Sequence, residues 1–207
     1  MRRLSTPERH PNGQCGTPMT VDPGKDLLFL ILRLLRSSHP DLVAALEAQR
    51  WHATPQVFTP APACAHLPAA IALCPATGSI AAIADRLTAL VHHLSWTADY
   101  PSHPILKDRF AHAVIARSDG ALVGCNLLGP HVAYPPHAHL ADEIYLPVSD
   151  SRAVFWQATT DTDTRATPGT PITHGPSEPH ALTTHDHPAL NLWLQHGEAP
   201  GGPTWFV

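Results

Sequence analysis

The sequence is poor in charged residues and has no run of basic ones. Asp, Glu, Lys and Arg together make up 14% of its 207 residues, and the formal net charge is −4 at pH 7. Proteins that bind nucleic acids through their phosphates carry a basic patch, stripe or arm. The charge pattern therefore excludes nucleic acid as an expected partner.

Long apolar runs are also missing. No stretch reaches the roughly 18 consecutive apolar residues that a membrane-spanning helix needs. The N-terminus lacks the basic, apolar and small-residue order of a signal peptide. We therefore expect a cytoplasmic protein without a membrane partner.

The cysteines form no recognisable framework. Cys15, Cys64, Cys74 and Cys125 are isolated from one another, none belongs to a CxxC motif, and none lies beside a histidine at ligand spacing. Disulfide-held domains and zinc–thiolate sites show regular cysteine spacing. Neither is expected here, which agrees with a reducing compartment.

Proline and histidine, by contrast, are abundant. The 23 prolines favour loops, turns and strand edges over a helical bundle, and the Pro-rich passage at 54–68 predicts a surface connection. The 16 histidines outnumber the 13 Lys and Arg residues, which suggests metal ligation. Several histidines are scattered, and we interpret them as structural: His10, His39, His52, His66, His92 and His93.

The first hundred residues predict an arm followed by helices. Residues 1–20 are polar with Pro and Gly, which is typical of a flexible arm. The Asp-Pro pair at 22–23 predicts the start of a largely buried helix, and His-Pro-Asp at 39–41 predicts a second. From residue 78, apolar residues recur at three- and four-residue spacing, as in a one-sided helix. We expect residues 21–100 to form a helical segment packed on the domain that follows.

The second half of the chain has a different texture. Short segments rich in β-branched and aromatic residues alternate with turn signals, which predicts a β-sandwich or barrel over residues 101–207. The expected strands lie within 110–116, 121–129, 131–136, 143–148, 153–159, 170–175, 179–184 and 189–195. The fold class is therefore mainly β with an N-terminal helical segment.

One stretch within this half, HVAYPPHAHLADEIYLPV at 131–148, concentrates chemically active side chains. Side chains alternate between the two faces of a strand. His137, His139, Glu143 and Tyr145 are separated by even steps, so they share a face if the stretch is extended. Two imidazoles and a carboxylate that converge inside a barrel predict a mononuclear metal site with open positions.

A barrel site of this kind needs one more ligand from a later strand. His180 follows a Gly/Pro turn and begins an apolar strand, so it is the preferred candidate. His174 remains the alternative. His185 and His187 fall in THDHP, which has the composition of an exposed turn.

The motif HAHLADE, with PHAL about 40 residues further on, resembles the two motifs of the cupin superfamily. Cupins are small double-stranded β-helix, or jelly-roll, barrels. They bind a divalent metal through two histidines and a glutamate of the first motif and one histidine of the second. The resemblance implies a small cupin barrel with His137, His139, Glu143 and His180 as the metal ligands.

A narrower resemblance rests on YPPHAHLADEIYLPVS, PSEPHAL and ALNLWLQHGE. These strings are similar to those of the cupin-type dimethylsulfoniopropionate (DMSP) lyases, which also carry an N-terminal helical segment. In that family one tyrosine before the first histidine and one after the glutamate frame the metal. The matching residues here are Tyr134 and Tyr145.

The resemblance implies β-elimination of DMSP, a small sulfonium carboxylate, to dimethyl sulfide and acrylate. A metal on the substrate carboxylate stabilises the charge that develops when the α-proton leaves. Tyr145 is the expected base, because a nearby dication favours the phenolate. Tyr134 is expected to hydrogen-bond the substrate carboxylate or a water on the metal.

The sulfonium group is a cation, and aromatic faces bind such groups. Trp193, Trp156 and Phe155 lie on expected barrel strands and are candidates for this contact. Alternation allows at most one of Phe155 and Trp156 to point inward.

Other readings stay open at this point. The same ligands serve an Fe(II) dioxygenase, an isomerase or hydrolase of a small carboxylate, or a non-catalytic cupin that binds a small ligand. The ligand set accepts Fe²⁺, Mn²⁺, Zn²⁺, Ni²⁺ or Co²⁺. The chain is expected to be a monomer or a homodimer.

Overall fold

The computed structural model describes residues 22–54 and 57–207, so the arm predicted at 1–20 lies outside the described residues. All the described helices come before residue 110, where the long strands of the barrel begin. They are α1 (Pro23–Leu35), α2 (Pro40–Glu47), the 3₁₀ helix η1 (Pro62–His66), α3 (Leu67–Ala72), α4 (Ala81–Leu90) and α5 (Leu106–Arg109).

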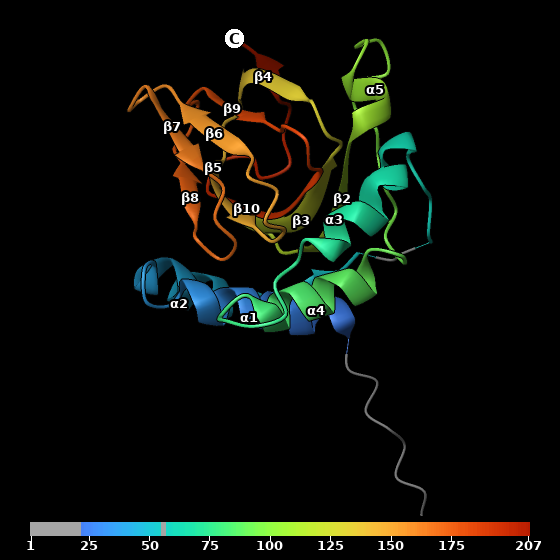
Figure 1. Ribbon diagram of the computed structural model, residues 1–207. Helices are drawn as coiled ribbons and strands as arrows, with labels where there is room; N and C mark the ends of the chain where they lie inside the picture. Colours follow the sequence, from blue (N-terminus) through green and yellow to red (C-terminus); the bar gives the residue numbers. More distant parts are fainter. Residues whose placement is uncertain (1–21, 55–56) are drawn as a thin grey trace, which may run out of the picture.

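The strands form two antiparallel sheets that face each other and build a β-barrel (Figure 1). The six-stranded sheet has the order β1 (His52–Ala53), β2 (Phe110–Arg117), β3 (Ala121–Leu128), β10 (Ala189–His196), β5 (Asp142–Pro147) and β8 (Ile172–His174). The five-stranded sheet has the order β11 (Trp205–Phe206), β4 (Ala133–Ala138), β9 (His180–Thr183), β6 (Val154–Gln157) and β7 (Thr162–Arg165). The predicted fold class is confirmed.

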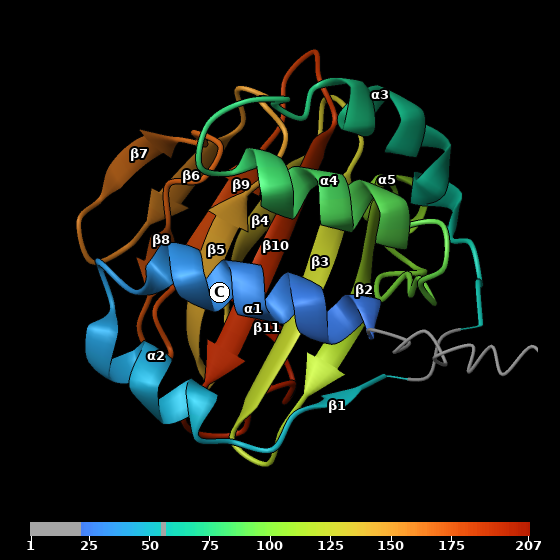
Figure 2. The same ribbon diagram turned by 90° about the horizontal axis from the view of Figure 1, so that it is seen from below.

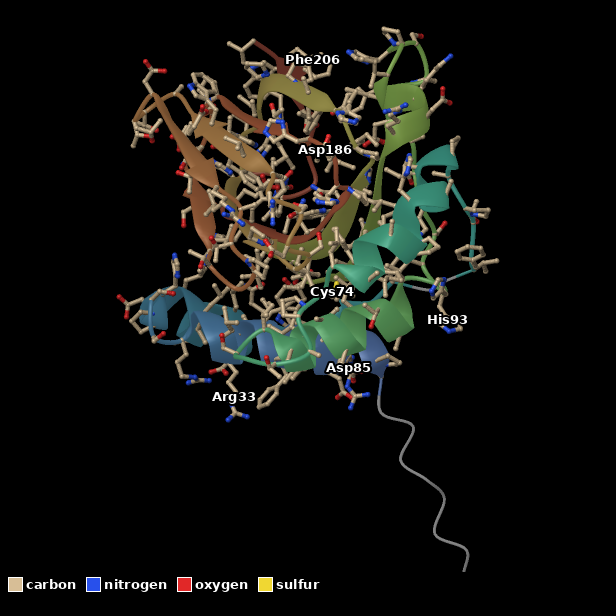
Figure 3. The ribbon with its side chains drawn as sticks, in the orientation of Figure 1. Arg33, Cys74, Asp85, His93, Asp186 and Phe206 are labelled. Atoms are coloured by element: carbon tan, nitrogen blue, oxygen red, sulfur yellow. The ribbon has the colours of Figure 1, made fainter. Side chains whose placement is uncertain are left out.

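Helix α1 begins where the sequence predicts. The Asp22 carboxylate caps it by accepting hydrogen bonds from the backbone N–H groups of Gly24 and Lys25. Figure 2 shows α1 and α4 lying across the outer face of the six-stranded sheet. Arg33 and Asp85 point away from that sheet, on the exposed side of the two helices (Figure 3).

The core runs through the helices and the sheet without a break. Leu27 and Leu35 of α1 and Leu87 of α4 are at most 1% exposed, and they belong to the same buried cluster as Val123 and Leu192 of the sheet. Each fully buried aliphatic side chain of this kind contributes about 1.5–3 kcal/mol to stability. Every residue of β3 is buried, because the helices cover one face of the strand and the barrel interior the other.

The Pro-Pro pair of β4 shapes the strand that carries His137. Neither proline has an N–H to donate, and the pairing with β9 shifts register between Tyr134 and His137. The shift brings His137 directly opposite His180. It also brings the rings of Tyr134 and His137 to 4.1 Å between centroids, although strict alternation would separate residues three apart.

Several elements differ from those predicted. The Pro-rich passage at 54–68 contains η1 as well as connecting chain, and η1 leads directly into α3. The short strands β1, β7 and β11 lack the apolar alternation that marks the others. The boundary at residue 100 stays a prediction. No helix among the described residues is both long and apolar enough to cross a bilayer.

Candidate metal centre

The candidate ligands come from both sheets and meet between them. His137 lies near the end of β4 and His139 follows that strand, whereas Glu143 lies on β5 of the opposite sheet and His180 begins β9. The motif is therefore two strands joined by a turn at 139–141. Its side chains converge because the two sheets face each other, and not because one extended strand presents them all.

Three of these residues form a compact group. The ligand atoms of His139, Glu143 and His180 all lie within 4.8 Å of one another, and the three side chains are buried. Glu143 Oε2 lies 3.2 Å from His139 Nε2 and 3.4 Å from His180 Nε2. The ring of His137 lies beside this group, with its centroid 4.2 Å from that of His180.

Backbone carbonyl oxygens fix the direction of all three imidazoles. The Nδ1–H groups of His137, His139 and His180 donate to the carbonyl oxygens of Pro135, Ala141 and Glu178, each at 2.9 Å. A carbonyl oxygen can only accept, so Nδ1 carries the proton and Nε2 carries the lone pair when the ring is neutral. This is the arrangement that orients histidine ligands in metal sites.

The charges of the group suit a cation. Burial, followed by the neighbouring His180, lowers the pKa of His137 to about 3, which keeps that ring neutral. Burial alone would raise the pKa of Glu143, but its contacts with His139 and His180 outweigh burial and hold the carboxyl well below its usual range. Burial opposes a charge on His139, yet the Glu143 carboxylate raises its pKa. The ionised Glu143 carboxylate thus lies among the buried rings of His137, His139 and His180, where a cation would be stabilised.

The burial of the donor atoms also suits a bound metal ion. His180 Nε2 is buried and makes no hydrogen bond with any residue that the structure describes. Glu143 Oε2 approaches this nitrogen to 3.4 Å, but a buried nitrogen without a hydrogen bond costs free energy unless something binds it. Imidazole nitrogens and one carboxylate are ligands that divalent transition metals accept. The residues present therefore fit a mononuclear metal ion.

His174, the alternative ligand, lies behind His180. It is the Cα partner of Glu143 across β5 and β8, and its ring stacks on that of His180 at 4.0 Å. Neither of its ring nitrogens has a hydrogen-bond partner in the described part of the chain. Burial and the neighbouring His180 lower the pKa of His174 to about 3. The structure groups His180, and not His174, with His139 and Glu143.

Tyr145 lies beside the group on the same strand as Glu143. Its hydroxyl oxygen accepts a hydrogen bond from Asn126 Nδ2 at 3.0 Å, and its ring packs against Phe155 at 5.1 Å. Burial, followed by the charge of Glu143, raises the pKa of the phenol well above its usual value. The direction is opposite to the one expected for a base, so that role requires a compensating cation nearby.

Tyr134 has a partner that the sequence did not reveal. Its hydroxyl is 2.5 Å from that of Tyr100, a residue before β2, and Phe110 stacks on its ring at 4.7 Å. Burial raises the pKa of Tyr134 well above its usual value. No local motif marks Tyr100, because the contact is made only after the chain folds.

The three aromatic candidates differ in their positions. Trp193 lines the pocket and lies over Gly124, where a Cβ atom would be 2.2 Å from the indole. Phe155 is buried inside the barrel, so alternation turns Trp156 outward. Trp156 Nε1 donates to Asp161 on the outer surface. The structure does not place Trp156 among the residues that line the pocket.

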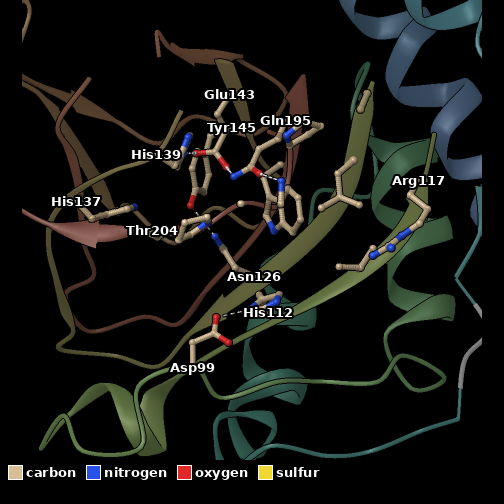
Figure 4. A pocket seen from close by; sticks show the side chains of 18 of the residues that line it. Asp99, His112, Arg117, Asn126, His137, His139, Glu143, Tyr145, Gln195 and Thr204 are labelled. Carbon is tan, nitrogen blue, oxygen red and sulfur yellow. Dashed lines mark hydrogen bonds and ion pairs between the residues drawn. The ribbon is translucent and has the colours of Figure 1, made fainter. Parts of the chain in front are cut away.

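A pocket of about 710 Å³ opens beside the candidate ligands. Figure 4 shows Glu143 between His139 and Gln195, and it shows the Asp99–His112 pair further along the wall. His112 Nδ1 is 2.7 Å from the Asp99 carboxylate. His112, Asn126 and Gln195 are polar residues in strands that are mainly apolar, and that interruption is the signal that could have identified them.

The segment after β10 closes one side of this pocket. Residues 200–204 line it, and β11 then pairs with β4 beside His137. Gln195 connects the segment to the ligand group, because its side-chain oxygen accepts from the Gly201 N–H at 2.8 Å while its nitrogen donates to Glu143. The described C-terminal segment therefore contacts both sheets next to the candidate ligands.

Sequence comparison gives one clear family. A family model described as "Dimethlysulfonioproprionate lyase" matches residues 35–191, a range that contains all four candidate ligands and both tyrosines. Among curated proteins, none matches this sequence.

Two solved structures are similar over most of the chain. One is the DMSP lyase DddQ from Ruegeria pomeroyi DSS-3, with a TM-score of 0.72 and 24% identity, covering 91% of this chain and 98% of that chain. The other belongs to the crystal structures of the DMSP lyases RdDddP and RnDddQII. Its TM-score is 0.67 and its identity 26%, and the match covers 89% of this chain and 99% of that chain.

Proposed function

This chain belongs to the DMSP lyase family and is a carbon–sulfur lyase, and from that premise we propose a metal-dependent β-elimination with Tyr145 as the base. The substrate is DMSP, and the products are dimethyl sulfide and acrylate. The observation that carries the proposal is the buried group of His139, Glu143 and His180, whose ligand atoms lie within 4.8 Å of one another, beside the Tyr145 phenol.

The proposed ligands are His137, His139, Glu143 and His180, around one divalent ion. Fe²⁺, Mn²⁺, Zn²⁺, Ni²⁺ and Co²⁺ all suit this donor set. When bound, the ion would withdraw charge from the substrate carboxylate and lower the pKa of nearby acids. The carbonyl contacts of the three Nδ1–H groups hold the imidazole rings for this task.

The Tyr145 phenolate removes the proton from the carbon next to the substrate carboxylate and becomes the neutral phenol. The electron pair of that C–H bond forms the new carbon–carbon double bond, and the bond between the β-carbon and sulfur breaks. Its electrons stay on sulfur, so dimethyl sulfide leaves as a neutral molecule and acrylate keeps the carboxylate. The buried position of Tyr145 keeps water from competing for the proton.

The pocket also offers a place for the sulfonium group. Trp193 and Tyr134 line it, and aromatic faces attract cations. Tyr134 is tied to Tyr100 by its hydroxyl, which orients its ring toward His137. A cytoplasmic location and a monomeric or homodimeric state stay expectations from the sequence.

The test is an anaerobic turnover assay. The purified protein is loaded separately with each of the five metals and mixed with DMSP, and headspace dimethyl sulfide and acrylate are measured. We expect equal amounts of both products without O₂, whereas a dioxygenase would need it. Failure to release dimethyl sulfide with any of these metals would reject the proposal.

Two variants test the proposed roles of His139 as a metal ligand and of Tyr145 as the base. His139→Ala is expected to lose both bound metal and activity. Tyr145→Phe is expected to keep its metal and to lose most of its turnover. If Tyr145→Phe releases acrylate at nearly the normal rate, Tyr145 is not the base.

A further inference from the structure

Three buried polar side chains are joined by hydrogen bonds beside the pocket, and two of them, Asn126 and Tyr145, line it. Asn191 Nδ2 donates to Asn126 Oδ1 at 3.0 Å, and Asn126 Nδ2 donates to the Tyr145 hydroxyl oxygen, also at 3.0 Å. Asn191 is completely buried, Asn126 is 1% exposed and Tyr145 is 5% exposed. These two hydrogen bonds link β10, β3 and β5 of the six-stranded sheet.

The strand register brings these three side chains together. Asn126 and Asn191 are Cα partners across β3 and β10, so their side chains emerge side by side on the barrel face. Tyr145 is the Cα partner of Trp193, two residues further along β10, and therefore lies diagonally across the same face. Asn126 lies between Asn191 and Tyr145 and can contact both.

The hydrogen bonds have a direction. An amide oxygen only accepts and an amide nitrogen only donates. Because Asn191 donates to the Asn126 oxygen, the Asn126 nitrogen faces Tyr145 and its oxygen does not. The Tyr145 oxygen therefore receives a hydrogen bond on the side of Asn126 and carries any proton of its own in another direction, where it lines the pocket.

The arrangement is costly as a purely structural device. Asn191 Oδ1 is buried and accepts no hydrogen bond from the described residues. The neighbouring positions of β10, Leu190 and Leu192, are fully apolar and buried. Replacing a poorly paired buried polar group by an apolar one of similar size is often neutral or stabilising. A folding role alone does not account for an amide at position 191.

We propose that Asn126, oriented by Asn191, is a positioning residue that directs the proton-accepting side of the Tyr145 oxygen into the pocket. The inference rests on the proposed function of Tyr145. Neither amide needs to touch the substrate. Both act through the tyrosine, so their loss changes the proton-transfer step and leaves substrate binding and metal loading unchanged.

The test uses the whole metal-loaded chain, four single variants and one double variant. Asn126→Leu removes the donor, and Asn126→Asp keeps the shape but presents only acceptors to Tyr145. Both are expected to lower kcat roughly 10- to 100-fold, the size expected for losing a hydrogen bond to a charged group such as the phenolate. KM for DMSP and metal content are expected to stay at wild-type values. With DMSP deuterated at the α-carbon, the kinetic isotope effect on kcat is expected to rise or stay at its maximum.

Asn191→Leu separates positioning from folding. We expect its melting temperature to equal or exceed that of the wild type while kcat falls, because Asn126 is then free to turn. A structural role predicts the reverse, with a lower melting temperature and unchanged kcat in the folded fraction. That reverse result, or wild-type kcat in Asn126→Asp, would overturn the inference.

Tyr145→Phe distinguishes this inference from the proposed function. Adding Asn126→Leu to Tyr145→Phe is expected to cause no further loss, because the amide has no hydroxyl left to position. An active Tyr145→Phe variant would reject the proposed base. An inactive Tyr145→Phe beside a fully active Asn126→Leu would reject only the role of Asn126. A further loss of the same size in the double variant would also reject it.

Discussion

Gln195 donates a hydrogen bond from Nε2 to Glu143 Oε1 at 3.0 Å, on the opposite side of the carboxylate from His139 and His180. The two residues are Cα partners across β10 and β5. The bond occupies one carboxylate oxygen and leaves Oε2 directed at the two imidazoles. Partners of this kind orient metal ligands and raise metal affinity.

Gln195→Leu is therefore expected to weaken metal binding, because Glu143 loses the donor that orients it. The expected loss in affinity is roughly 10- to 100-fold, measured by competition with a metal chelator. The matched control is Gln49→Leu, which removes a glutamine that bonds Ser118 away from the ligand group. Equal metal affinity in both variants would contradict a role for Gln195.

His180 and His174 are expected to behave differently when replaced. His180→Ala removes a grouped ligand and should abolish metal binding. His174→Leu removes two buried nitrogens that have no hydrogen-bond partner among the described residues, so we expect the full metal content and a melting temperature that is unchanged or higher. Metal analysis of the two purified variants checks this, and loss of metal from His174→Leu would identify His174 as a ligand.

The metal-free protein is expected to lose stability as the pH falls. The folded pKa of His174 is about 3 and its ordinary value is 6.5, so between them only the unfolded chain binds the proton. The free energy of unfolding therefore decreases with falling pH, approaching about 1.4 kcal/mol per pH unit for this residue. His137 acts in the same direction.

Urea denaturation of chelator-treated protein between pH 6.5 and 5 measures this slope. His174→Leu should reduce it by about one proton, which is ~1.4 kcal/mol per pH unit near pH 5. An unchanged slope in the variant would show that His174 is protonated in the folded state.

Gly124→Ala is expected to destabilise the protein. The added Cβ would lie 2.2 Å from the Trp193 ring and 2.6 Å from the Ala113 carbonyl oxygen, and backbone cannot move aside cheaply. Overpacking of this kind costs about 1–3 kcal/mol, measured by urea denaturation. Gly120→Ala is the control, since its nearest atoms belong to the Gln49 side chain at 3.5 Å. Similar stability of the two variants would contradict the close packing.

Local patterns in the sequence predicted much of this architecture. The alternating segments of the second half became strands, and the Asp22 cap marked the start of α1, because both signals depend on neighbours along the chain. The ligand motif also concentrated its chemistry in one short stretch. Its geometry was less predictable, since a turn and two opposed sheets bring Glu143 to His139.

Other parts of the site depend on contacts between distant residues. Tyr100, Asn126 and Gln195 reach the site through tertiary contacts and strand register, and no spacing rule relates them to the motif at 131–148. The bulge at the two prolines overrides alternation and places Tyr134 beside His137. The same alternation, where no bulge interrupts it, turns Trp156 to the outer surface.

Strand β3 is buried along both faces, so its outer face depends on the helices that cover it. Removal of α1 and α4 would expose a broad apolar sheet surface to water, and such surfaces promote aggregation. The helical layer and the barrel should therefore unfold together in a single cooperative transition. Neither part is expected to be soluble when it is expressed without the other.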